Sequence, residues 1–431
     1  PEPEPELKED LSGPSQYSYQ ITTEDWSNSS NVKRTNMREH GDILYSQAKY
    51  GESVSTSGNY LVVGSPEEYY GDDTTTRTGI AYLYEYNENT KEWNKDQPTI
   101  LKPSTTDRQH DFGETVVING NYMAISSSQS QVWYDSSTFD FANDTFDSNS
   151  NFSFTNSYQY SRYNGIVYLY KLSNGSWSEI SKITVPYYGN NSKIGDDGGL
   201  DIHDTGNGCY IGVGDNWYED NTMSGRGCVH IFKVNTDNTW KYNGIVVAVK
   251  ENGEDDSDDS YYGKSMSNSS KVISINSNYL LVSNQERDVI YNDATINDLG
   301  VVYLYKKNII GDNESWDIFK RINLIDYLDQ ISSNFNHSDI HFGSSIKLLN
   351  NYIIIGASQK SIKEDEDDKS GAVYLFKFDS TNIVLLKELK AIDYPNFDSF
   401  VLLTGSNGDY FGNDLDIKQN SDQDNYTIIV T

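Results

Sequence analysis

One phrase recurs six times along this chain of 431 residues. It opens with an aromatic residue or isoleucine before a glycine, runs through two short apolar segments, and usually ends in a sequence close to Gly-x-Val-Tyr-Leu-Tyr. Self-similarity at a spacing of about 60 to 80 residues indicates one supersecondary unit repeated around or along an axis. The six copies open at Tyr50-Gly51, Phe112-Gly113, Ile194-Gly195, Tyr262-Gly263, Phe342-Gly343 and Phe411-Gly412.

Each full copy predicts four short antiparallel strands. In the second copy these strands are expected at 114–118, at 122–126, at 166–172 and from about Trp177 onward. Alternating residues such as Tyr168-Leu169-Tyr170 are typical of a strand, because successive side chains point to opposite faces. Asn174-Gly175 has the composition of a tight hairpin turn. The sequence therefore predicts an all-β fold, a β-propeller built of four-stranded antiparallel blades.

The sixth copy supplies only two strands, 411–417 and 426–430. The missing pair is predicted near the other end of the chain, since Tyr17-Ser18-Tyr19-Gln20-Ile21 has the alternation of a third strand. Trp26 follows Tyr17 by nine residues, and the matching intervals in the first four copies are 11, 9, 10 and 13. We expect residues 16–30 to complete the last blade, either within one chain or between subunits. Closing the ring in this way would remove exposed sheet edges.

This interpretation gives two regions. Residues 1–14 alternate proline and glutamate, a composition typical of an extended polyproline II arm without packing of its own. Residues 15–431 form one propeller domain, with six blades favoured. The chain begins Pro1-Glu2 without an initiator methionine, as expected of a processed product or a fragment.

The phrase resembles the FG-GAP repeat of integrin-α-like β-propellers over about residues 45–431. The best matches are Tyr50-Gly51 with Gly64-Ser65-Pro66, and Phe342-Gly343 with Gly356-Ala357-Ser358. The resemblance implies that the glycines permit close packing of neighbouring blades, which agrees with the absence of a side chain at glycine. The fuller form of the family has seven blades, so seven is the alternative count.

The resemblance does not extend to the calcium loops of many family members, which are rich in aspartate. The corresponding turns in this chain, such as Thr56-Ser57-Gly58-Asn59 and Asn119-Gly120-Asn121, are short and offer too few carboxylates for the six to eight oxygen ligands of calcium. No metal site and no cofactor is therefore predicted. The acidic runs at 254–259 and 364–368 are interpreted as solvated loops, with loose calcium binding as the alternative.

Charge and composition exclude some partners. A net charge of −31 and a pI near 4.4 argue against binding to nucleic acid or to an anionic membrane surface. The sequence has no apolar run long enough for a membrane span. Hydrophobic residues make up 36% of the chain and tyrosine occurs 34 times. We therefore expect thin layers between strands, with tyrosines at their margins.

Two cysteines, Cys209 and Cys228, lie in the third copy. In a secreted protein such a pair suggests a disulfide. They stand at the starts of two consecutive predicted strands, which places them at opposite ends of a hairpin, about 15–20 Å apart. The sequence leaves the bond undecided.

Asn-x-Ser/Thr sequons mark the chain as a candidate N-glycoprotein. Asn425 is the weakest of them, because it abuts a predicted strand. The positions expected to carry glycans are Asn28, Asn143, Asn151, Asn174, Asn190, Asn268, Asn313 and Asn336.

No catalytic motif is recognisable, neither a Ser/His/Asp elbow, nor H-E-x-x-H, nor a glycine loop that would cradle phosphate. His110 and His341 stand beside equivalent openings of the repeat, which favours a role in blade packing over catalysis. We therefore expect a protein that is not an enzyme.

The function favoured by these features is that of an extracellular or cell-surface structural glycoprotein that is secreted and self-assembles into a filament. Its subunits would exchange residues 16–30 by strand addition. The alternative is an integrin-like adhesion propeller that binds a protein or a glycan through loops rich in aromatic residues. Those loops include Tyr69-Tyr70, Tyr187-Tyr188 and Trp217-Tyr218. A hydrolase would need a carboxylate cluster at the ring centre, and the sequence identifies none.

Overall fold

The fold is taken from a computed structural model, and the chain divides into two compact units, Pro1–Leu44 and Tyr45–Thr431. All described residues belong to the second unit. They are residues 48–68, 78–94, 97–104, 111–134, 147, 152–153, 160–162, 164–185, 193–196, 198–215, 227–247, 271–311, 313–331, 339–360, 370–390, 412–419 and 426–430.

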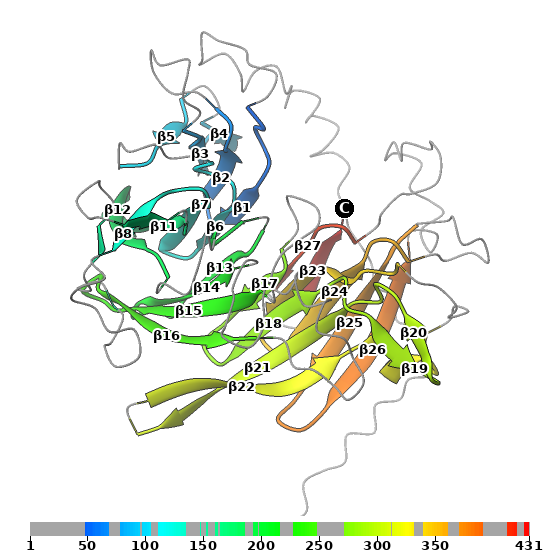
Figure 1. The fold of residues 1–431 in the computed structure, drawn as a ribbon. Coiled ribbons are helices and arrows are strands. Elements are labelled where there is room, and N and C mark those ends of the chain that lie inside the picture. The colour runs from blue at the N-terminus through cyan, green and yellow to red at the C-terminus, as the bar shows by residue number, and fades with distance from the viewer. Residues whose placement is uncertain are drawn as a thin grey trace, which may run out of the picture. The chain divides into compact units, whose positions relative to one another are not determined.

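The described part of the chain is built almost wholly of antiparallel strands, and each of the first three repeats forms its own sheet (Figure 1). The first sheet contains β1 (Val54–Ser57), β2 (Tyr60–Ser65), β3 (Ile80–Asn87), β4 (Glu92–Trp93) and β5 (Thr99–Leu101). The second contains β6 (Val116–Asn119), β7 (Tyr122–Ser127), β11 (Ile166–Ser173) and β12 (Ser176–Ile183). The third contains β13 (Leu200–Asp204), β14 (Cys209–Asp215), β15 (Cys228–Val234) and β16 (Trp240–Val246).

The later repeats continue the pattern until the sixth, which forms a two-stranded sheet. The fourth sheet contains β17 (Ile273–Ile275), β18 (Tyr279–Asn284), β21 (Val301–Ile310) and β22 (Asn313–Ile322). The fifth contains β23 (Phe342–Leu349), β24 (Tyr352–Ala357), β25 (Ala372–Phe378) and β26 (Ile383–Lys390). The sixth contains β27 (Leu415–Gln419) and β28 (Tyr426–Val430).

A few shorter elements lie in the connections. They are the small sheet of β8 (Val132–Tyr134), β9 (Phe152–Ser153) and β10 (Tyr160–Arg162), the hairpin of β19 (Val289–Tyr291) and β20 (Ala294–Ile296), and the 3-10 helix η3 (Leu324–Tyr327).

The sheets follow one another as the blades of a β-propeller. The first strand of each repeat contacts the first strand of the next, in the order β1, β6, β13, β17, β23 and β27. Each later strand of a repeat pairs with the one before it in its sheet, except that β4 and β5 both pair with β3, and so lies farther from this inner row. The prediction of an all-β propeller with four-stranded antiparallel blades is confirmed.

The predicted number of blades needs correction. Six were expected, with seven as the alternative, whereas the described residues form five complete blades. The sixth repeat forms only the β27–β28 hairpin, because no third strand pairs with β28 among the described residues. Residues 16–30, predicted to complete that blade, and the arm at 1–14 lie outside the described residues.

The hydrophobic core lies between the sheets. One cluster joins the first and second blades, another the second and third, a third extends from the third to the fifth, and a fourth reaches Leu415 of the sixth repeat. A blade with a neighbour on each side buries both faces. Hence Tyr168, Leu169 and Tyr303 are all fully buried. The expectation that tyrosines lie at the layer margins was wrong for these positions.

The glycine that opens a repeat is required by this packing. Gly113 has a backbone φ of +95°, which side chains with a Cβ rarely adopt, and a Cβ there would lie 2.5 Å from the Ile80 carbonyl oxygen of the first blade. Its own carbonyl oxygen would lie 1.8 Å from a Cβ on Gly64. Two consecutive blades therefore meet backbone against backbone at this point.

Candidate functional site

The sixth repeat presents a hairpin with an open side among the described residues. Its strands pair in register, with Leu415 opposite Val430 and Gln419 opposite Tyr426. β27 contacts β23 and β24 of the fifth blade, so the hairpin occupies the position of the first two strands of a sixth blade. In the other five repeats the second strand also pairs with a third, whereas β28 pairs only with β27 in the part of the chain that the structure describes. An unpaired strand edge is a template for the addition of another strand.

On the side of the fifth blade, the sixth repeat makes the ordinary contact between blades. Gly412 has a φ of +92°, and its carbonyl oxygen would lie 2.0 Å from a Cβ on Gly356. The Ser344 and Ser345 hydroxyls also donate hydrogen bonds to this oxygen, at 3.1 and 2.7 Å. The sixth repeat is thus docked as closely as the complete blades are.

Among the described residues, the first repeat lacks the corresponding neighbour. Gly51 has a φ of +89°, almost the same as that of Gly113, and a Cβ there would meet no described atom within 4 Å. Every other opening glycine in the described residues has such a contact from the blade before it, at Gly113, Gly195, Gly343 and Gly412. The surface that packs against a preceding blade is therefore formed in the first repeat, but no described blade occupies it.

Polar side chains link the inner strands to one another. The hydroxyls of Ser53, Ser55 and Ser57 on the first repeat accept hydrogen bonds from the amides of Val116, Ile118 and Gly120, at 3.0, 3.1 and 3.0 Å. These amides face away from the strand partner of β6, so they need acceptors from outside the sheet.

The same kind of link joins later blades. Asn119 accepts from the amide of Asp204, Asp201 from that of Ile275, and Ser274 from that of Leu348, at 2.9 to 3.1 Å. The inner strands of the first four blades therefore each supply acceptors to the inner strand of the following blade.

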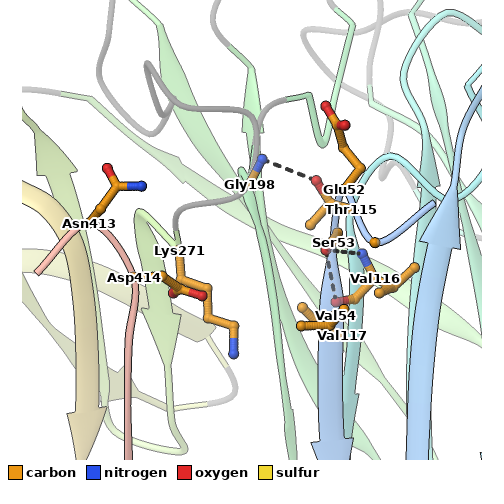
Figure 2. Close-up of a pocket in the computed structure, with 11 residues that line it drawn as sticks. Glu52, Ser53, Val54, Thr115, Val116, Val117, Gly198, Lys271, Asn413 and Asp414 are labelled. Carbon is orange, nitrogen blue, oxygen red and sulfur yellow. Dashed lines mark hydrogen bonds between the residues drawn. The ribbon is translucent and has the colours of Figure 1, made fainter. Parts of the chain in front are cut away.

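A cavity of ≈ 210 Å³ lies where the inner strands meet. Repeats one, two, three, four and six all contribute to it (Figure 2). Asn413 and Asp414, which lead into β27, lie across the cavity from Ser53 and Val54. The remaining lining residues are Gly51, Glu52, Thr115, Val116, Val117, Gly198 and Lys271. The first and sixth repeats thus face one central space. Its volume is below the roughly 300–1,000 Å³ typical of pockets for small organic ligands.

Two acidic side chains near this centre share a hydrogen bond. Glu114 follows the opening glycine of the second repeat, and Asp196 follows that of the third. Burial raises the pKa of the Glu114 carboxyl well above its usual value, and the nearby Asp196 carboxylate raises it further. The Ser128 hydroxyl donates a hydrogen bond to the Glu114 carboxyl, and this bond lowers the pKa of Glu114. The raised pKa favours the protonated form of the Glu114 carboxyl, and the pair connects two neighbouring blades.

Sequence reasoning identified no carboxylate cluster at the ring centre, so it missed this pair. A signal was present, because acidic residues follow the opening glycine in three consecutive repeats, at Glu52, Glu114 and Asp196. The repeat spacing places equivalent positions side by side once the blades form a ring.

The cysteines are not bonded to each other. Both are free and buried, and they lie at opposite ends of the β14–β15 pair, where Cys209 faces Val234 and Cys228 faces Asp215. Six residues of strand separate the two ends, about 20 Å. The alternative of a disulfide is therefore wrong, and the argument from strand register is confirmed.

Two of the predicted glycosylation positions lie among the described residues, and both are exposed. Asn174 lies in the turn between β11 and β12, and Asn313 begins β22. The other six lie outside the described residues: Asn28, Asn143, Asn151, Asn190, Asn268 and Asn336.

His341 lies where two blades meet. It is 7% exposed, and its amide donates to the Asp298 carbonyl oxygen at 3.0 Å. Its ring lies beside the Asp298 and Asp339 carboxylates, a group of metal-ligand type. This position fits the predicted packing role, whereas His110 lies outside the described residues, as do the acidic runs at 254–259 and 364–368 and the aromatic loop pairs.

Comparisons with known proteins give no family. No family model matches the chain, and no curated protein matches it.

No helix among the described residues has the length and hydropathy needed to cross a membrane.

Solved structures give distant similarities. The Bombyx mori GH32 beta-fructofuranosidase is 12% identical with a TM-score of 0.32, over 78% of this chain and 61% of that one. The Pseudomonas aeruginosa periplasmic gluconolactonase is 8% identical with a TM-score of 0.26, over 79% and 85%. Saccharomyces cerevisiae Sqt1 is 8% identical with a TM-score of 0.32, over 89% and 94%. The chain thus spans less than two thirds of the fructofuranosidase structure. At TM-scores this low, none of these similarities bears on activity.

Proposed function

We propose that this protein is a non-catalytic, secreted structural glycoprotein whose subunits assemble into a filament through the incomplete sixth blade. In this proposal residues 16–30 of one subunit supply the third and fourth strands beside β28 of the next. The observation that carries the proposal is the open β27–β28 hairpin, which is docked on the fifth blade and has no described third strand.

The repeat pattern gives the register of the donated strand. In the second blade Tyr168 lies opposite Ile125, and Ile125 in turn lies opposite Val116, the third residue after the opening glycine. In the sixth repeat the third residue after Gly412 is Leu415, which lies opposite Val430. Aligning Tyr17 with Tyr168 therefore places Tyr17 opposite Val430. An antiparallel strand then places Gln20 opposite Thr427.

Aromatic contacts in the complete blades support this alignment. The tyrosine of the third strand packs edge-on against the opening aromatic residue of its own repeat, as Tyr168 does against Phe112 at 5.1 Å between ring centroids. In the second and fourth blades the tryptophan that follows packs against the second strand of the preceding blade, as Trp177 does against Tyr60 at 5.5 Å and Trp316 against Tyr210 at 5.9 Å. In the proposed blade Tyr17 and Trp26 take these two roles.

Self-assembly also agrees with the packing surface of the first repeat, which no described blade covers. A completed sixth blade adjoins Gly51, where a described neighbour is lacking. Each donated segment would then convert two open features, the β28 edge and the Gly51 surface, into buried ones. Donation to a neighbour makes an open-ended series of subunits, whereas donation within one chain makes a closed monomer.

The acidic residues at the centre are arranged differently from the carboxyl pair of a glycoside hydrolase. Glu114 and Asp196 share a hydrogen bond, which brings their carboxyl oxygens into contact. Glycoside hydrolases instead hold their two carboxyl groups about 5 to 10 Å apart, with the sugar between them. The exposed Asn174 and Asn313 agree with N-glycosylation outside the cell.

Deletion of residues 1–30 tests the proposal. We expect the shortened chain to keep its strand content, measured by circular dichroism, and to remain monomeric in analytical ultracentrifugation under conditions in which the full chain forms filaments visible by electron microscopy. Deletion of residues 1–14 alone is the control and should leave assembly intact. Filaments formed by the chain that lacks residues 1–30 would contradict the proposal.

A further inference from the structure

The third blade departs from the other described blades at three neighbouring buried positions. Where the third strand meets the end of the second, the described blades pair Ser65 with Ile80, Ser127 with Ile166, Asn284 with Val301, and Ala357 with Ala372. The third blade pairs Asp215 with Cys228 instead. Two residues further on, the other blades have a tyrosine at positions 82, 168, 303 and 374, and the third blade has His230. Three ligand-type residues thus replace their counterparts together in one copy of the repeat.

The three side chains converge on one point in the core. Cys228 and His230 are fully buried and Asp215 is 1% exposed. The Cys228 Sγ lies 3.3 Å from His230 Nε2, and an Asp215 carboxylate oxygen lies 3.4 Å from the same nitrogen. All three donor atoms lie within 4.8 Å of one another.

This arrangement is not that of a nucleophile and its base. In a Cys-His-Asp relay the sulfur and the carboxylate face opposite nitrogens of the imidazole. In this blade both face Nε2, and the other nitrogen, Nδ1, lies 3.1 Å from the Tyr242 hydroxyl. A shared nitrogen that points to a common centre is the geometry of metal ligands.

We propose that Asp215, Cys228 and His230 form a buried zinc site in the third blade. Tetrahedral zinc bonds of about 2.0 to 2.3 Å hold neighbouring donor atoms about 3.3 to 3.6 Å apart, which agrees with the two distances to Nε2. The hydroxyl of Tyr242 fixes the histidine ring through Nδ1, as partners of metal-bound histidines do.

Charge favours the same assignment. Zinc carries two positive charges, and one thiolate with one carboxylate carries two negative charges, so the loaded site is neutral. Neutrality lowers the cost of burying these ionised groups in the core. The site joins the end of β14 to the start of β15, and it would fasten the base of the long connection between these strands.

Metal loading of the full chain tests the site. After incubation with zinc and desalting, we expect one zinc ion per chain by elemental analysis and a raised melting temperature. With cobalt as the probe, we expect the visible bands of a tetrahedral ion and a charge-transfer band from the thiolate. Cobalt bound without the charge-transfer band, or less than half an equivalent of zinc retained, would overturn the proposal.

The repeat itself provides the variants. His230→Tyr and Cys228→Ile install the residues of the second blade, so they should fold, as checked by circular dichroism. Both should abolish zinc retention and the charge-transfer band. Cys209→Ala removes the distant thiol and should leave both signals unchanged. A band that survives in folded His230→Tyr, or disappears in folded Cys209→Ala, would show that the ion binds elsewhere.

Discussion

Two glycines of this chain allow the energetic cost of backbone strain to be measured apart from the cost of a steric clash between blades. Gly51 and Gly113 have nearly the same backbone conformation, with φ of +89° and +95°. A Cβ on Gly51 meets no described atom within 4 Å, whereas on Gly113 it meets the Ile80 carbonyl oxygen at 2.5 Å. The pair therefore isolates blade packing from backbone strain.

We expect Gly51→Ala to lower the free energy of unfolding of the monomer by about 1–2 kcal/mol, the cost of a left-handed conformation for alanine. Gly113→Ala should cost about 1–3 kcal/mol more, because the new methyl group forces two backbones apart. Chemical denaturation of both variants, in the chain that lacks residues 1–30, gives the comparison. Equal losses would mean that the tight contact at Gly113 does not contribute to stability.

The carboxyl pair at the centre makes stability depend on pH. The pKa of Glu114 is raised in the folded protein, chiefly by burial, so the native state binds more protons than the unfolded state above the ordinary glutamate pKa. The free energy of unfolding therefore falls as the pH rises from that value through the raised pKa.

Glu114→Gln keeps a neutral hydrogen-bonding group next to Asp196 and removes this titration. We expect the wild type to lose more stability than the variant as the pH rises above the ordinary glutamate pKa of about 4.3. Glu52→Gln, at the equivalent position of the first repeat, removes one formal charge and serves as the control for overall repulsion. Parallel pH profiles for the wild type and Glu114→Gln would contradict the raised pKa of Glu114.

At the scale of the strands, serine hydroxyls replace the sheet partner that an inner strand lacks. Ser55 is buried and accepts from the Ile118 amide, while Ser57 accepts from the amide of the exposed Gly120. Ser55→Ala leaves a buried amide without its acceptor and should cost about 1–3 kcal/mol. Ser57→Ala, where water can replace the hydroxyl, should cost less than about 0.5 kcal/mol. Thermal unfolding measures both, and a larger loss for Ser57→Ala would contradict this role.

The strands themselves were largely predictable, because their alternation and turn residues are local properties. The expected strand at 166–172 is β11 (Ile166–Ser173), and the expected start of the next strand near Trp177 agrees with β12 (Ser176–Ile183). The pairing of Asp215 with Cys228 follows from the antiparallel register of two predicted strands. The proposed metal site was not predicted, because the repeat pattern consists of the residues that the copies share. Asp215, Cys228 and His230 are residues in which the third copy differs from the others.

Burial could not be read from the same patterns. An alternation such as that of Tyr168 and Leu169 normally distinguishes the solvent-exposed face of a sheet from its buried face, yet both residues are fully buried. A blade between two others has no solvent-exposed face. The alternating side chains therefore pack against two different neighbouring blades. The Glu114–Asp196 pair was missed for a related reason, since the approach of two residues 82 positions apart depends on the blade-to-blade angle.

For the molecule as a whole, the central claim is that residues 16–30 of one chain complete the sixth blade of another. The predicted register places Gln20 opposite Thr427, so cysteines at these two positions should form a disulfide across the new strand pair. The wild type is the control, because its own two thiols are buried and lie apart.

The most direct measurement mixes two single variants, Gln20→Cys and Thr427→Cys, under assembly conditions and oxidises them. We predict disulfide-linked dimers that contain one chain of each kind, seen by mass spectrometry after non-reducing electrophoresis. A second chain carries both substitutions, Gln20→Cys and Thr427→Cys. If the mixture of single variants stays monomeric while this double variant forms a disulfide within one chain, the sixth blade is completed by its own chain. That result would contradict filament formation through strand exchange.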